Sequence, residues 1–158
     1  MTRHSAGLLV FRRRGENDAL ELLLAHPGGP FFARKDLGVW TIPKGEYDDD
    51  EPALAAAERE FAEEIGLVPP DGPRIDLGEV RQASGKRVRA FAVEGDLDLD
   101  GAMSNLFEME WPVGSGQMGR FPEIDRAEWF SAEESRAKLN PAQAEFVGRL
   151  EERVGKSG

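Results

Sequence analysis

The sequence predicts a mixed α/β layer fold formed by one domain. Short apolar runs bounded by Gly and Pro predict strands, and they are interspersed with segments whose apolar residues recur at helical spacing. The chain has 158 residues, of which 40% are apolar, so it is long enough to bury one core. Strands interspersed with helices pack as layers. We therefore expect a single domain over residues 1–154, followed by a loose tail at 155–158.

The first half of the chain predicts a hairpin, a long loop and a helix. Two apolar runs flank a turn at residues 15–18, and a loop at 27–38 carries three glycines and two prolines. A loop of this length in a compact domain is functional or mobile. Pro52 suits a first helical residue after a cap at Asp50 or Glu51, and Gly66 is a good helix stop.

The chain after this helix predicts four more strands, one capped helix and a last amphipathic helix. Ser131 and Glu134 have the spacing of a capping box, and Asn140 precedes Pro141 at the start of the last helix. Residues 95–101 form an acidic loop and residues 112–122 are Gly-rich and irregular. The predicted strands are 5–13, 20–25, 39–42, 75–80, 88–93, 106–111 and 127–130, and the predicted helices are 52–65, one from 131 and one from 140.

Composition excludes several classes of function. The net charge is −10, with 20 basic against 30 acidic residues, which argues against general nucleic-acid binding. The absence of cysteine excludes disulfides, thiolate metal sites and a cysteine nucleophile. The apolar runs are too short to cross a membrane. We expect a cytoplasmic protein, a monomer or homodimer, whose partner is a nucleotide-sized molecule.

Three glutamates gather on one side of the predicted helix. At about 100° per residue, Glu60, Glu63 and Glu64 fall together, away from a buried stripe predicted at Leu54, Ala57, Phe61 and Ile65. Like charges at this spacing repel each other, and a metal cation would offset that cost. Mg²⁺ prefers oxygen ligands of this kind. For the helix alone, a solvated acidic face is the competing interpretation.

The residues around this helix resemble the signature of the Nudix hydrolases. That signature is Gly, five residues, Glu, seven residues, Arg-Glu-apolar, one residue, Glu-Glu, one residue, and Gly-apolar. Every fixed position and both spacings match at Gly45, Glu51, Arg59-Glu60-Phe61, Glu63-Glu64 and Gly66-Leu67. The resemblance implies an α/β/α sandwich with a mixed β-sheet. It also implies a pyrophosphohydrolase that cleaves a nucleoside diphosphate linked to another group.

The same resemblance implies roles for the matched residues. Glu60 and Glu64 would bind Mg²⁺, for which Mn²⁺ can substitute, and Glu63 would be a further ligand or the general base. Arg59 would orient the glutamates while paired with Glu51. Gly45 would let the backbone approach the metal and offer its carbonyl.

Two segments outside the helix also resemble family members. Residues 121–125, Phe-Pro-Glu-Ile-Asp, are similar to a segment of RNA pyrophosphohydrolases that supplies a metal-binding or base glutamate, here Glu123, with Asp125 as a second candidate. An ordinary loop acid is the alternative. Residues 40–45 resemble diadenosine polyphosphate hydrolases, and Lys44 is a candidate for phosphate contact.

Further candidates rest on residue type alone. Arg87 and Arg89 alternate on a predicted strand, so both could face a phosphate chain or form a charged solvent face. Base stacking is possible at Phe31, Phe32 and Trp40, with packing as the alternative. Both other tryptophans, Trp111 and Trp129, are predicted to be core, and both histidines, His4 and His26, structural or surface residues.

The sequence therefore predicts a Mg²⁺-dependent hydrolase of dinucleoside polyphosphates or nucleoside triphosphates, acting through metal-activated water. Hydrolysis of ADP-ribose or sugar nucleotides is the alternative. A catalytically silent Nudix fold would be expected to lack one of the signature glutamates. Here Glu60, Glu63 and Glu64 are all present. The acidic run at 48–51 lacks the alternation of an EF-hand, which argues against a Ca²⁺-binding protein.

Overall fold

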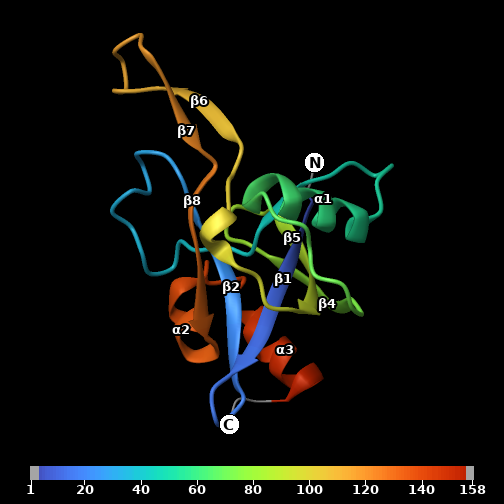
Figure 1. The fold of residues 1–158 in the computed structure, drawn as a ribbon. Helices are drawn as coiled ribbons and strands as arrows, with labels where there is room; N and C mark the ends of the chain where they lie inside the picture. The colour runs from blue at the N-terminus through green and yellow to red at the C-terminus, as the bar shows by residue number, and fades with distance from the viewer. Residues whose placement is uncertain (1–3, 156–158) are drawn as a thin grey trace.

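A mixed sheet of six strands forms the centre of the molecule in the computed structural model, which describes residues 4–155. The order is β4-β5-β1-β2-β8 (Figure 1). The short strand β3 pairs with the start of β1. β1 and β5 run parallel, and the other pairs run antiparallel. The strands are β1 His4–Arg14, β2 Ala19–Pro27, β3 Lys44–Glu46, β4 Ile75–Arg81, β5 Arg87–Glu94 and β8 Ile124–Ser131.

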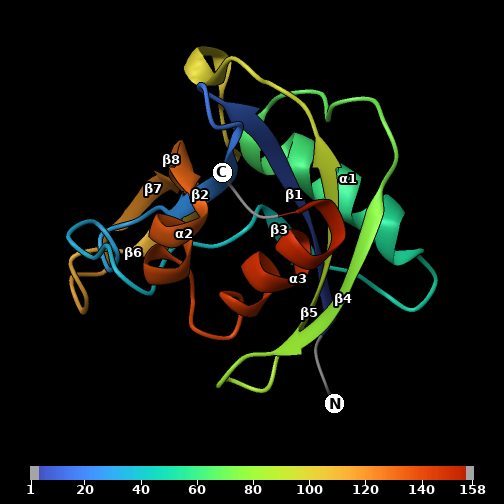
Figure 2. The same ribbon diagram turned by 90° about the horizontal axis from the view of Figure 1, so that it is seen from below.

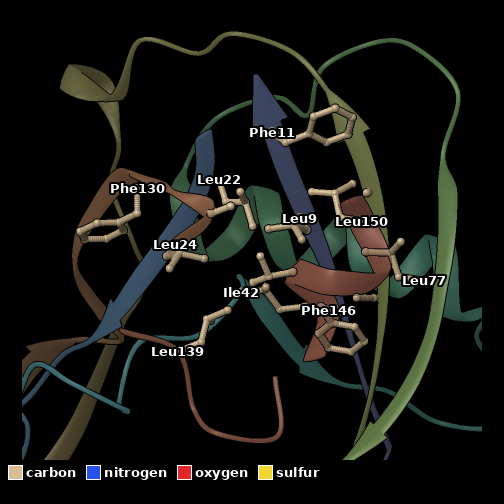
Figure 3. Packing of buried hydrophobic residues seen from close by; sticks show 14 of the residues in the cluster. Leu9, Phe11, Leu22, Leu24, Ile42, Leu77, Phe130, Leu139, Phe146 and Leu150 are labelled. Atoms are coloured by element: carbon tan, nitrogen blue, oxygen red, sulfur yellow. The ribbon is translucent and has the colours of Figure 1, made fainter. Parts of the chain in front are cut away.

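Helices cover both faces of this sheet, so the predicted α/β/α sandwich is confirmed. Helix α1 (Ala53–Ile65) packs on the face that carries Leu8 and Val10 of β1. Helix α3 (Glu145–Val154) packs on the opposite face, where Phe146 and Leu150 meet Leu9 and Leu22 (Figures 2 and 3). Alternation of side chains along β1 supplies both cores. A short helix, α2 (Ala132–Lys138), lies against β2 and β8.

Helix α1 begins and ends close to the predicted residues. Pro52 is the cap rather than the first helical residue, because its ψ of 140° is extended. Gly66 ends the helix with a φ of 75°, a conformation that glycine adopts without steric cost, and its N–H bonds to Ala62. The buried stripe includes Ala56 in place of Leu54, because small side chains let the helix lie close to β1.

A second, two-stranded sheet projects from the body as a hairpin (Figure 1). Its strands are β6 (Leu106–Glu110) and β7 (Met118–Pro122), paired from Leu106–Pro122 to Glu110–Met118. The prediction of irregular structure throughout 112–122 is therefore wrong, because the Gly-rich composition belongs mostly to the hairpin turn. Trp111 is also not core: it is 37% exposed and meets Phe31 edge-on, with ring centres 5.5 Å apart. Trp129 is partly buried beneath Arg12.

The strand predicted at 39–42 is reduced to two isolated bridges. Thr41 pairs with Ala25 of β2, whereas Trp40 pairs with Leu139 after α2. The chain therefore crosses between two neighbours instead of following one. The next amide, of Ile42, bonds to the side chain of Gln143.

The C-terminal helices follow the predicted caps in part. Ser131 and Glu134 form the predicted capping box of α2. Asn140 instead caps a turn, accepting a hydrogen bond from the N–H of Ala142, and α3 begins only at Glu145. A short 3₁₀ turn, η1 (Leu99–Gly101), lies in the predicted acidic loop. No helix within residues 4–155 is long and apolar enough to span a bilayer. Most of the predicted tail, 156–158, lies outside the described residues.

Candidate active site

The signature glutamates Glu60, Glu63 and Glu64 lie where α1 crosses the short strand β3. A Cβ atom on Gly45 would lie 2.0 Å from the carboxyl carbon of Glu60, so the side chain of Glu60 rests directly on this glycine. The Glu60 side chain is only 14% exposed, whereas that of Glu63, on the next turn, is 44% exposed. Glycine at position 45 thus allows a carboxylate of α1 to approach the backbone of β3.

Arg59 holds three of the acidic side chains in place. Its Nε and Nη2 atoms donate to both carboxylate oxygens of Glu51, at 2.9 and 2.8 Å. Its Nη1 atom donates to Glu60 at 2.7 Å and to Glu63 at 3.4 Å. The hydrogen bonds from Arg59 hold the pKa of Glu51 below its usual value, and those to Glu51 and Glu60 raise the pKa of Arg59. This planar fork fixes the orientation of the carboxylates.

The electrostatics of the site oppose full ionisation of its acids. Burial, together with the charges of Glu60 and Glu123 and against the opposing effect of Lys44, raises the pKa of Glu64 to about 8. Burial also raises the pKa of Glu60, although Arg59 lowers it. The pKa of Lys44 is lowered, first by burial and then by Lys86. The carboxylates of α1 and Glu123 are thus close enough to repel each other.

An open pocket of about 470 Å³ adjoins these residues. Its walls come from the loop after β2, from β3, from α1 and from the hairpin and the segment that follows it. Polar and charged groups, from Lys44, Glu64, Glu123 and Thr41, share it with two aromatic rings. The lining residues are Pro27, Gly28, Phe32, Thr41, Lys44, Glu64, Phe107, Glu123 and Ile124.

The donor set suits a hard divalent cation such as Mg²⁺. Glu60, Glu64 and Glu123 offer carboxylate oxygens whose mutual repulsion a cation would relieve, and Gly45 leaves the space beside Glu60 open to backbone approach. Within residues 4–155, no three acidic or histidine side chains are grouped closely enough to hold an ion as they stand. Arg59 engages Glu60, so binding would require the carboxylates to turn toward each other.

Residues 1–150 match the family model of the NUDIX domain. The chain belongs to the Nudix family. The family model supports a pyrophosphohydrolase enzyme. Solved structures resemble the chain over nearly its whole length and share its fold. No curated protein matches the sequence.

Three of the similar structures illustrate the range of the Nudix fold. A Caenorhabditis elegans Ap4A hydrolase in a binary complex is 18% identical with a TM-score of 0.64, covering 97% of this chain and 98% of that one. The NUDIX domain of Shewanella oneidensis NrtR, complexed with ADP ribose, is 17% identical with a TM-score of 0.64, covering 98% and 89%. The MutT protein from Methanosarcina mazei is 20% identical with a TM-score of 0.60, covering 98% and 96%.

The structure brings many of the predicted site residues of this Nudix domain together. Lys44, Glu64, Glu123 and Phe32 line one pocket, although the chain separates them by up to 91 positions (123 − 32). Next to them lie Gly45, Glu60, Arg59 and Glu63, in the contacts described above. Phe107 and Thr41 also line the pocket and were not predicted. Phe107 lies in the predicted strand 106–111, but nothing in that run indicates a long-range contact.

Other predicted residues lie elsewhere in the Nudix fold. Trp40 is 1% exposed, and its Nε1 donates to Asp36 at 2.7 Å, so it packs in the core. Arg87 and Arg89 lie on β5 and pair with Glu79 and Asp76 of β4. Their partners are acids of the neighbouring strand, as expected for the charged-face interpretation rather than for phosphate contact.

Proposed function

We propose that the chain is a Mg²⁺-dependent hydrolase that cleaves a diphosphate linkage in a nucleotide, either a dinucleoside polyphosphate or a nucleoside triphosphate. The observation that carries this proposal is that one pocket beside helix α1 is lined by Lys44, Glu64 and Glu123. A cation and several carboxylates facing one space suit a phosphate chain together with a divalent ion.

Each polar residue of the pocket has a chemical task in this proposal. Lys44 donates to a phosphate oxygen and offsets its charge. Glu60 and Glu64, with the carbonyl of Gly45, would hold Mg²⁺, which when bound neutralises phosphate charge and acidifies water. In the absence of a cation, Arg59 holds Glu60 and Glu63 in their orientation through its pair with Glu51.

We assign to Glu123 the role of general base, which removes the proton of the attacking water. Glu123 lines the pocket, whereas Glu63 does not line it and is bonded to Arg59. A base must lie within hydrogen-bond reach of the water, and an acid that lines the pocket meets that requirement. Water bonds to one phosphorus as the bridging P–O bond breaks. A dinucleoside polyphosphate thus yields two nucleotides, and a nucleoside triphosphate yields a nucleotide and inorganic phosphate or pyrophosphate, with no covalent protein intermediate.

The two aromatic rings of the pocket suit a nucleobase. Phe32 comes from the loop after β2 and Phe107 from β6, so they approach from two different elements. Stacking on such rings is worth about 1–3 kcal/mol per base and tolerates different bases. The solved neighbour complexed with ADP ribose keeps ADP-ribose and sugar nucleotides as a second candidate class.

A panel of nucleotides with Mg²⁺ tests the proposal. Diadenosine tetraphosphate, ATP, ADP-ribose and UDP-glucose are incubated with the protein in ¹⁸O-water, and products are identified by mass. We expect diphosphate cleavage with one ¹⁸O in a phosphate product, fastest for the first two. Preference for the last two would move the substrate class to the alternative. Binding without cleavage of any compound would contradict the hydrolase.

A further inference from the structure

The end of β2 and the start of β8 do not pair in a regular ladder. His26 pairs with Arg126, but the next residue, Pro27, pairs with Ile124, so Asp125 is an extra residue on β8. Such a bulge redirects neighbouring side chains and is common beside active sites. Glu123 lies two residues before Asp125, at the wall of the pocket.

The side chain of His26 fills the bulge and is fully buried. Its Nδ1 atom lies 2.7 Å from Oδ1 of Asp125, and its Nε2 atom lies 2.7 Å from the carbonyl oxygen of Lys35. A carbonyl only accepts hydrogen bonds, so Nε2–H donates to Lys35, and the bond to Asp125 requires a second proton, on Nδ1 or on the carboxyl. The ring of Trp40 packs against it edge-on at 5.0 Å.

His26 therefore connects two walls of the pocket. Lys35 belongs to the loop that carries Phe32, and Asp125 lies two residues after Glu123. The backbone of Glu123 is held on its other side too, because its carbonyl accepts from the N–H of Gly28 at 2.8 Å. A Cβ atom on Gly28 would lie 1.8 Å from the carbonyl oxygen of Pro122, so the two segments pack too closely for any side chain at position 28.

We propose that His26 is a positioning residue: through Asp125 it fixes the bulge that directs Glu123 into the pocket, and through Lys35 it holds the loop that carries Phe32. The proposal rests on the role given to Glu123 in the proposed function. It assigns His26 no contact with substrate.

Two substitutions separate the two hydrogen bonds. The amide of asparagine lies near the place of Nδ1, so His26→Asn keeps a donor toward Asp125 and loses the bond to Lys35. The longer glutamine has its amide near Nε2, so His26→Gln keeps the bond to Lys35 and loses that to Asp125. We expect His26→Gln to lower kcat about tenfold with little change in KM, and His26→Asn to raise KM severalfold with little change in kcat.

Because His26 is buried, Asp125→Ala provides a test at a partly exposed position whose side chain is 30% exposed. It should lower kcat about tenfold in the wild-type background and hardly at all in a Glu123→Gln background, which by itself should lower kcat about a hundredfold. The matched control is Glu128→Ala, an acid of the same strand that pairs with Arg126 and should leave kcat unchanged.

A readout without metal or substrate completes the experiment. Amide hydrogen exchange at Gly28, whose N–H donates to Glu123, should accelerate in Asp125→Ala and His26→Gln and remain slow in Glu128→Ala. Unchanged exchange, or an equal fall in kcat in both backgrounds, would overturn the positioning role. If Glu123→Gln kept full kcat, the assigned role of Glu123 would fall and the catalytic part of this proposal with it. Accelerated exchange would then still establish that His26 fixes the bulge.

Discussion

Gly45 and Glu60 meet so closely that a methyl group on the glycine would lie 2.0 Å from the carboxyl carbon of the glutamate. Real Cβ atoms essentially never come within 3.0 Å of another heavy atom, so one partner would have to move. The backbone of β3 and the carboxylate of α1 are therefore positioned against each other, and this contact sits beside the proposed metal site.

Gly45→Ala should displace the Glu60 carboxylate and lower kcat/KM by at least about tenfold, since small misplacements in a catalytic site are costly. The matched control is Gly148→Ala in α3, where a Cβ meets nothing within 4 Å. That variant should keep full activity and gain about 0.5–1 kcal/mol of stability, because alanine is the better helix former. Steady-state kinetics and thermal unfolding of both variants check this, and equal activities of the two would count against it.

Arg59→Lys should lower kcat about tenfold or more, because a lysine cannot reproduce the forked contact with both oxygens of Glu51. The charge is kept, so the loss would report orientation rather than net charge. Arg74→Lys is the control, since Arg74 pairs with Glu58 of the same helix. Steady-state kinetics of the two variants should therefore diverge. Full activity of Arg59→Lys would show that the fork is dispensable.

In the absence of divalent metal, the stability of the protein should fall as pH rises from about 4.5 to about 8. The pKa of Glu64 is raised to about 8 by burial, so the folded state holds a proton that the unfolded state releases near 4.5. Stability from this group is complete below that window and lost across it. Urea unfolding in EDTA at several pH values measures the slope.

Glu64→Gln should remove that slope and be the more stable protein at pH 8, whereas the control Glu58→Gln should keep it. Adding Mg²⁺ should restore stability to the wild type at high pH and have less effect on Glu64→Gln. A wild-type stability that does not depend on pH across the window would show that Glu64 is not held in a desolvated site.

Phe32→Ala should raise KM about tenfold for a nucleotide with little change in kcat, as expected for loss of one base stack. The control is Phe31→Ala, at the preceding residue. Phe31 is 55% exposed and contacts Trp111 of the hairpin, so its removal should leave KM nearly unchanged. If the two variants exchanged these effects, the base would be placed against the hairpin tip instead of in the pocket.

The sequence predicted those parts of the site that are local in the chain. Helix α1, its glycine stop and the clustering of Glu60, Glu63 and Glu64 follow from helical periodicity. The contact between Arg59 and Glu51 spans eight residues and was implied by the family resemblance. The continuous apolar run at residues 8–11 predicts a strand there, and the structure buries both faces of β1.

The predictions that failed concern residues whose contacts lie far away in the sequence. Trp40 packs edge-on against Phe130 of β8, far away in the sequence, and the residues around Trp40 give no indication of this contact. The run at 39–42 looks like a strand but finds two different partners. Strand β7 was not predicted, because the glycines next to it indicate irregular structure. His26 was correctly predicted as structural, but its link to Asp125 across 99 positions could not be read from the chain.

The most direct test of the central claim is the turnover of Glu64→Gln beside that of the wild type, at saturating Mg²⁺, on the best substrate of the nucleotide panel. If the carboxylates of α1 hold the metal, Glu64→Gln should lose at least about a thousandfold in kcat while its circular dichroism spectrum matches the wild type. Near-normal turnover by a folded Glu64→Gln protein would contradict the account.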